Sequence, residues 1–273
     1  METQVVLITG ASAGIGFSLA NILMKKGIIV YAASRRGGEN ISDTESGGKI
    51  ISLKMDVNNE EEIASSVDKI ISENGRLDAI VCNAGNGISG SIEDTSSEEV
   101  KYQFETNFFG AVKCIQACLP QFRKQVYGKI MLTSSVAGIV PIPYQAFYSA
   151  SKSALITFMN ALSLEVKPFG IQCCSVLPGD TKTEFTAARK YAEKSQKTES
   201  AYYETLKKSI GRMERDEQNG MSPEAVAKVM ARQLTRRKMK LQIVPGFQYK
   251  VICLLFGWLP LRFKLWIIAL LYA

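Results

Sequence analysis

The chain has 273 residues, of which 46% are hydrophobic, so it can bury a substantial core. It carries a net charge of +7 and no histidine, which excludes His-dependent triads, histidine metal sites and histidine pH switches. The excess of basic residues suits anionic partners or simply a solvated surface. The sequence has no arginine runs interleaved with aromatic residues, the pattern that would indicate nucleic-acid binding. Its six cysteines form no C-x-x-C pair, which indicates a reducing compartment.

The chain begins with a strand, a glycine turn and a helix. Residues 4–9 are apolar and β-branched, and a helical pattern follows to about residue 26. Glycines let a backbone approach a pyrophosphate, and the helix N-terminus then offers unpaired N–H groups. The spacing is G-x-x-x-G-x-G rather than G-x-G-x-x-G. We predict a dinucleotide phosphate site at Gly10, Ser12, Ala13, Gly14, Ile15 and Gly16.

The second predicted strand, residues 28–33, ends in Ser34, Arg35 and Arg36. Enzymes that use NAD usually carry Asp or Glu about 20 residues past the glycines, where it binds the ribose hydroxyl. Guanidinium groups instead bind a 2′-phosphate. The sequence therefore predicts NADP(H) over NAD(H), although Glu39 nearby keeps NAD(H) as an alternative.

Further strands and helices alternate along the chain. We predict strands at 50–55, 77–82, 128–133, 171–177 and 241–244, and helices at 60–74, 97–124, 148 to about 168, and 223–235. The charged segment 181–220 is either a mobile cover over the site or a solvated helical insertion. The alternation predicts an α/β fold, a Rossmann-type doubly wound parallel sheet of about seven strands flanked by helices on both faces. Residues 1–250 would form a single catalytic domain.

Polar residues follow several of these strands, where open α/β sheets place ligands. Asp56 and Val57 follow one strand, and the Asp56 carboxylate either accepts from an adenine amine or caps the next helix. Asn83, Ala84 and Gly85 follow another, and Ser134 and Ser135 a third. Asn107 lies mid-helix among apolar neighbours, as a structural link or a holder of a water molecule.

Tyr148 and Lys152 lie four residues apart and therefore on one face of a helix. A neighbouring ammonium favours the phenolate and lowers the phenol pKa, which would make Tyr148 an acid or base near neutral pH. Ser135 could hydrogen-bond the same substrate oxygen. Taken alone, a Tyr and a Lys four residues apart on a helix are usually a solvated surface pair.

Together these motifs resemble the short-chain dehydrogenase/reductase family over residues 3 to about 185. The matching residues are Thr9-Gly10-x-x-x-Gly14-x-Gly16, Asn83-Ala84-Gly85, Asn107, Ser135, Tyr148-x-x-x-Lys152, and Pro178-Gly179 followed by Thr183. Cys82 departs from the family, which often has Asn there. The resemblance implies that Tyr148 is the acid/base, Lys152 lowers its pKa and holds the nicotinamide ribose, Ser135 orients the substrate oxygen (Ser134 being the competing candidate) and Asn107 anchors a water. Thr181 and Thr183 would hold the nicotinamide carboxamide or the phosphate side of the cofactor, which Pro178 and Gly179 would also contact.

Segments 87–97 and 138–147 resemble the hydroxysteroid and retinol dehydrogenase branch. Ile142, Tyr144 and Phe147 would contribute to an apolar substrate wall. We expect an NADP(H)-dependent oxidoreductase that interconverts a secondary alcohol and a ketone on a steroid, retinoid, bile acid or long-chain lipid. A lipid or 3-ketoacyl-type reductase and a redox sensor with little turnover are the alternatives. A homo-oligomer, dimer or tetramer, is also expected, with no metal.

The tail, residues 251–273, is almost entirely apolar and long enough in residue count to approach a membrane span. Pro260, Arg262 and Lys264 interrupt it, so a helix–break–helix at the membrane surface is the better interpretation, anchored by Trp258, Trp266 and Tyr272. Packing on the protein body or across a subunit interface is the alternative. With no predicted signal peptide, we expect a cytoplasmic protein, peripheral on a membrane if the tail binds lipid.

Overall fold

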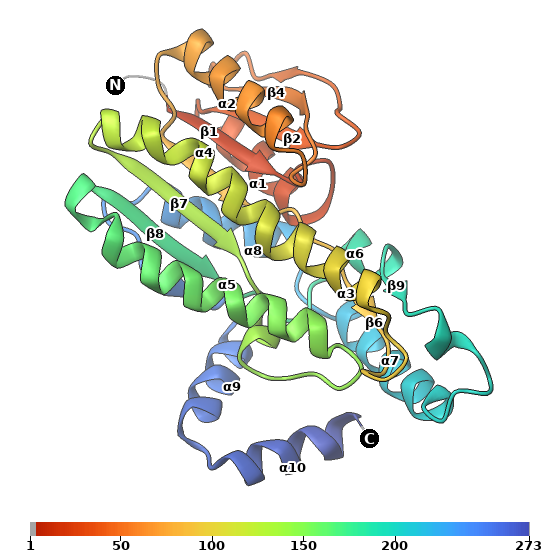
Figure 1. The fold of residues 1–273 in the computed structure, drawn as a ribbon. Coiled ribbons are helices and arrows are strands. Elements are labelled where there is room, and N and C mark those ends of the chain that lie inside the picture. The colour runs from red at the N-terminus through yellow and green to blue at the C-terminus, as the bar shows by residue number, and fades with distance from the viewer. Residues whose placement is uncertain (1–3, 273) are drawn as a thin grey trace.

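The computed structural model describes residues 4–272 and is built around one large, mostly parallel sheet (Figure 1). Within those residues the strand order is β10-β8-β7-β5-β1-β2-β4-β3. The strands are β1 (Val5–Thr9), β2 (Ile29–Ser34), β3 (Ile41–Ser42), β4 (Lys49–Lys54), β5 (Ala79–Cys82), β7 (Gly128–Thr133), β8 (Ile171–Val176) and β10 (Gln242–Ile243). All neighbours pair in parallel except β3, which is antiparallel to β4.

Helices cover both faces of the sheet. On one face lie α2 (Glu60–Asn74), α4 (Gly110–Lys124) and α5 (Ala146–Glu165); on the other lie α1 (Gly14–Met24) and α8 (Pro223–Leu234). Each layer buries its own hydrophobic core against the sheet. Because the central strands are covered on both sides, they read as continuous apolar runs such as VVLIT in β1. The predicted doubly wound α/β fold is confirmed.

Two local features differ from the sequence prediction. Strand β3 lies within the predicted loop, and both its residues are exposed, so no burial pattern marked it. The predicted helix 97–124 has those limits but is divided into α3 (Ser97–Phe104), a π-helical turn (Glu105–Phe109) and α4. Asn107 lies in this wider turn, and π turns inside α-helices are frequent at functional sites.

The segment after β8 is ordered as a helical insertion with a small second sheet. It contains α6 (Glu184–Ala187), β9 (Lys190–Tyr191) and α7 (Tyr203–Gln218). Strand β9 pairs in parallel with β6 (Ile88–Ser89), which ties the insertion to the chain before α3. Single 3₁₀ turns span Val136–Gly138, Lys167–Phe169 and Lys194–Gln196.

The tail forms two helices, α9 (Phe247–Trp258) and α10 (Leu261–Tyr272), which meet at Pro260 (Figure 1). The predicted helix–break–helix is therefore confirmed. Helix α10 packs against α7, so the tail also contacts the protein body. Within residues 4–272, no helix is long and apolar enough to cross a membrane.

Candidate active site

A cavity of about 1000 Å³ opens at the carboxyl ends of the parallel strands. It brings together most of the residues that the sequence singled out. Its lining includes Gly10, Ser12, Ala13, Gly14, Ile15, Ser34, Arg35, Arg36, Asp56, Val57, Asn83, Ala84, Gly85, Ser135, Ile142, Tyr148, Lys152, Pro178, Gly179, Thr181 and Thr183. Four predicted residues, Gly16, Asn107, Tyr144 and Phe147, are not part of the lining.

The turn between β1 and α1 leaves backbone donors facing the cavity. Gly10 and Gly14 have φ values of +64° and +57°, which side chains other than hydrogen rarely allow. Helix α1 begins after Ala13, which cannot cap it, and its first turn holds no acidic residue. The first N–H groups of α1 are therefore available to an anion, and this cradle fits a cofactor phosphate. Gly16 serves packing instead, because a Cβ there would lie 2.5 Å from the Gly10 carbonyl oxygen.

Arg35 and Arg36 follow β2 and line the same cavity with exposed side chains. Glu39, the residue that kept NAD(H) open, is exposed and does not line the cavity. Asp56 lines it from the end of β4, where its carboxylate accepts a hydrogen bond from the Asn58 amide at 3.0 Å. The two positive side chains thus stand at the edge that the sequence assigned to the 2′-phosphate.

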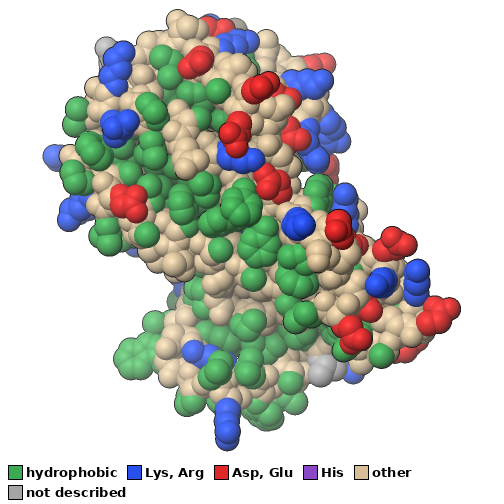
Figure 2. Space-filling model, in the orientation of Figure 1, with side chains coloured by type: hydrophobic (Ala, Val, Ile, Leu, Met, Phe, Trp, Pro, Cys, Tyr) green, Lys and Arg blue, Asp and Glu red, His purple; other side chains and the backbone are tan. Residues whose placement is uncertain are grey.

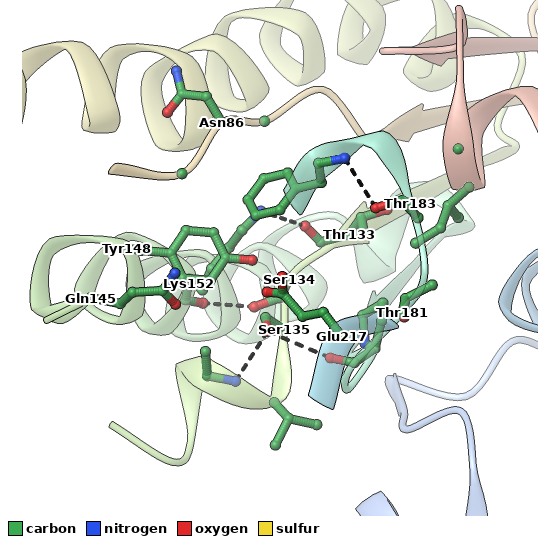
Figure 3. A pocket seen from close by; sticks show the side chains of 18 of the residues that line it. Asn86, Thr133, Ser134, Ser135, Gln145, Tyr148, Lys152, Thr181, Thr183 and Glu217 are labelled. Carbon is green, nitrogen blue, oxygen red and sulfur yellow. Dashed lines mark hydrogen bonds between the residues drawn. The ribbon is translucent and has the colours of Figure 1, made fainter. Parts of the chain in front are cut away.

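Ser135, Tyr148 and Lys152 meet in the middle of the cavity (Figure 3). Lys152 donates from Nζ to the Thr133 carbonyl at 3.0 Å, and its ammonium lies 5.6 Å from the Tyr148 ring centre. The Ser135 hydroxyl accepts from the Ala137 amide at 3.1 Å and lies close enough to Tyr148 to influence its pKa. The neighbouring Ser134 is buried and donates to the Lys152 carbonyl at 2.8 Å, so its hydroxyl holds helix α5 to the strand end.

Burial dominates the acid–base properties of this group. It raises the pKa of Tyr148 to about 12, and the nearby Ser135 hydroxyl lowers that pKa only in part. Burial also lowers the pKa of Lys152 to about 8, since the charged form is disfavoured away from water. In this arrangement the Lys152 ammonium is directed at the Thr133 carbonyl, and the lowering of the Tyr148 pKa by Lys152 stays a prediction. Tyr148 is a protonated phenol at neutral pH, the form that donates a proton.

Asn107 is fully buried and fixes the loop after β5. Its Oδ1 accepts from the Asn86 amide at 2.8 Å, and its Nδ2 donates to the Asn86 carbonyl at 3.0 Å and to Ser151 Oγ at 3.2 Å. These bonds join the π turn, the loop and α5, the helix of Tyr148 and Lys152. The structural-link interpretation of Asn107 thus has direct support, and a water-holding role stays a prediction.

The structure adds wall residues that sequence reasoning missed. They come from the insertion and the tail: Asp180, Glu184, Phe185, Met213, Glu217, Tyr249, Ile252, Leu255, Phe256, Leu259, Ile267, Ile268, Leu271 and Tyr272. The Phe185 ring lies 5.7 Å from that of Tyr148. Of the predicted substrate residues, Tyr144 instead bonds Thr205 on the exposed surface. Nothing in the sequence distinguishes Glu217 from the other charged residues of its helix. The apolar tail stands out in the sequence, but its position against the cavity could not be predicted.

The sequence profile described as short chain dehydrogenase matches residues 4–194. The chain belongs to the short-chain dehydrogenase family. It is 40% identical to a 3-ketodihydrosphingosine reductase of Bacteroides thetaiotaomicron, covering 100% of this chain and 99% of that one. It is 31% identical to a probable short-chain dehydrogenase/reductase of Helicobacter pylori, over 93% of this chain and 92% of the relative. A solved short-chain dehydrogenase from Streptomyces avermitilis superposes with a TM-score of 0.77 at 28% identity, covering 93% and 92% of the two chains.

The expected family is thus confirmed, and the protein is an oxidoreductase of the dehydrogenase/reductase type. The expected relation to hydroxysteroid and retinol dehydrogenases stays a prediction. The likeness to the Bacteroides reductase extends past residue 194, where the family profile ends, and includes the segment that forms α9 and α10.

Proposed function

We propose that this enzyme uses NADPH to reduce the ketone of a long-chain lipid, specifically a 2-amino-3-ketone of the 3-ketodihydrosphingosine type, to the secondary alcohol. The observation that carries the proposal is the continuity of the cavity. One space joins the α1 N-terminus, the Ser135–Tyr148–Lys152 group and the apolar inner face of α9 and α10. The 40% identical relative supports a lipid ketone over the steroid or retinoid considered from the sequence.

The tail supplies the wall suited to a hydrocarbon chain. Its cavity-lining residues are Tyr249, Ile252, Leu255, Phe256, Leu259, Ile267, Ile268, Leu271 and Tyr272. None of these lining residues is charged, so this wall offers an alkyl chain contacts without a charged group to desolvate. Each buried methylene contributes about 0.8 kcal/mol, which makes a long chain the main source of affinity.

The phosphate groups of the cofactor would be held by the α1 N-terminus, with Arg35 and Arg36 at a 2′-phosphate. Asn83, Ala84, Gly85, Thr181 and Thr183 line the cavity between that edge and Tyr148, and would position the nicotinamide half. When bound, NADPH supplies the hydride that reduces the carbonyl carbon. Arg35 and Arg36 directly follow β2 in the lining, where an acidic residue would repel a 2′-phosphate, and Glu39 is outside the lining, which supports NADPH over NADH.

Tyr148 and Ser135 would stabilise the substrate oxygen as negative charge develops on it. Tyr148, protonated at neutral pH by its raised pKa, donates the proton that completes the alcohol. Lys152 would stabilise the phenolate that is left when Tyr148 has given up its proton, and Asn107 holds α5 and the loop after β5 in register. The cavity wall thus supplies candidate side chains for the proton donor and for the hydrogen-bond donors that ketone reduction needs.

The outer face of α9 and α10 would rest on a membrane surface. Trp258 is 85% and Leu261 67% exposed, and Figure 2 shows hydrophobic side chains gathered over this part of the molecule. Lys250, Arg262 and Lys264 are the charged residues of the two helices and suit anionic headgroups. A lipid substrate could then enter the cavity from the membrane without crossing water.

A substrate panel tests the proposed reaction. We expect NADPH oxidation with 3-ketodihydrosphingosine, with kcat/KM at least tenfold above that for steroid, retinoid and small cyclic ketones. We expect this ratio of kcat/KM values because the apolar wall buries the methylenes of the long alkyl chain. Preference for a steroid or a retinoid, or turnover of none of the ketones, would refute the lipid assignment.

Tyr148→Phe tests the proton donor. Removing the hydroxyl should lower kcat by about 100-fold or more, because general acid catalysis contributes about 10²–10⁴-fold. NADPH affinity, followed by nucleotide fluorescence, should change less than about twofold. The matched control is Tyr202→Phe, which removes an exposed hydroxyl bonded to Glu93 outside the cavity. Wild-type turnover in Tyr148→Phe would contradict the role.

The double variant Arg35→Ala with Arg36→Ala tests cofactor choice. Loss of charge-assisted bonds to a phosphate should raise the KM for NADPH by about 10–100-fold and leave that for NADH nearly unchanged. Arg232→Ala, on α8 and outside the cavity, serves as the control. A wild-type enzyme that prefers NADH would rule out the assignment to the 2′-phosphate.

Vesicle flotation tests the membrane proposal. The wild type should float with anionic phospholipid vesicles, and Trp258→Ser with Leu261→Ser should shift most of the protein to the soluble fraction. Leu164→Ser, on α5 and 73% exposed, controls for loss of any surface hydrophobe. Absence of flotation, with a dimer or tetramer that dissociates in the double variant, would instead assign this face to a second copy of the chain.

A further inference from the structure

The insertion contains an ion pair between Arg189 and Glu217, and Glu217 lines the cavity that also contains Tyr148 and Ser135. Arg189 is fully buried at its side chain and donates from Nη2 to Glu217 Oε1, while Thr186 donates to Glu217 Oε2 at 2.6 Å. The Glu217 side chain is only 14% exposed, yet it lines the cavity. Figure 3 shows it extending toward the side where Ser135 and Tyr148 lie.

The charge at this wall is not balanced. Arg189 lies near two carboxylates, Glu217 and Glu214, the latter 3.9 Å from Arg189 Nη1 and bonded by Tyr191 at 2.8 Å. Within this ion-pair group one positive charge therefore faces two negative charges, so Arg189 does not fully offset the carboxylates. The Nε and Nη1 atoms of Arg189 make no hydrogen bond within the described residues, so the pair is not an optimised structural bridge.

The Glu217 carboxylate also has capacity left. An ionised carboxylate accepts about four hydrogen bonds, and Arg189 and Thr186 use one on each oxygen. Its charge is felt at the reacting centre: burial is the main cause of the raised pKa of Tyr148, and Glu217 raises that pKa further. A cation held by Glu217 would therefore lie next to a carbonyl held by Tyr148 and Ser135.

We propose that Glu217 binds the ammonium group that a 2-amino-3-ketone carries on the carbon next to its carbonyl. This inference rests on the proposed function and adds the specificity-determining residue for it. The ketone oxygen lies at Tyr148 and Ser135, the ammonium at Glu217, and the alkyl chain along α9 and α10. Arg189 and Thr186 act as positioning residues that orient the carboxylate.

The test measures selectivity between two substrates. The wild type and Glu217→Gln are each assayed with NADPH and two substrates. One is the long-chain 2-amino-3-ketone, and the other is the same ketone without its amino group. The kcat/KM ratio of the two should fall by about 10- to 100-fold in the variant, the range for hydrogen bonds to charged groups. Glu204→Gln, an exposed carboxylate on the same helix and outside the cavity lining, should keep the wild-type ratio.

A wild-type measurement covers the case in which Glu217→Gln does not fold. Acetylating the substrate amine removes its charge, and the wild type should then lose at least tenfold in kcat/KM relative to the free amine. An unchanged ratio in a folded Glu217→Gln that binds NADPH normally, or equal use of the free and acetylated amines, overturns the role of Glu217 alone. A wild type that reduces neither ketone overturns the proposed function together with this inference.

Discussion

Desolvation at the carboxyl edge of the sheet is the constraint on which the rest of the site depends. Lys152 is buried and Tyr148 is half-buried beside it, and desolvation raises the pKa of the phenol and lowers the pKa of the ammonium. Such a pair is costly unless its polar atoms are satisfied. The Lys152 ammonium donates to the Thr133 carbonyl, Ser134 donates to the Lys152 carbonyl, and Ser135 lowers the pKa of the phenol in part. The residues at the end of β7 thus supply the hydrogen-bond partners that allow α5 to hold Tyr148 and Lys152 at the cavity.

The parallel sheet then determines what else can meet that pair. All strand ends that carry polar residues open on one edge, so the glycine turn, the arginines after β2 and the loop after β5 share one cavity. The insertion and the tail close the other side of it. Helix α10 packs on α7, and α7 carries Glu217, so the apolar wall and the charged group are held by neighbouring helices.

Sequence reasoning was strong where local chemistry determines the outcome. Buried strands read as apolar runs, and β7 and α2 have the predicted limits. Gly10, Ser135, Tyr148 and Lys152 were expected in one site from the family resemblance, and they line one cavity. Side-chain positions that depend on packing between distant segments of the chain were not predicted correctly. Tyr144 was expected in the substrate wall but bonds Thr205, and Glu217 reaches the cavity only because of how α7 docks. Burial is the main cause of the raised pKa of Tyr148, which spacing along a helix cannot reveal.

The central claim is that one cavity holds a reacting ketone at Tyr148 and an alkyl chain along α9 and α10. The most direct measurement is kcat/KM with NADPH for a series of 2-amino-3-ketones that differ only in chain length. The account predicts a rise of up to about fourfold per methylene, corresponding to about 0.8 kcal/mol each, until the apolar wall is covered. A kcat/KM that is independent of chain length would contradict it.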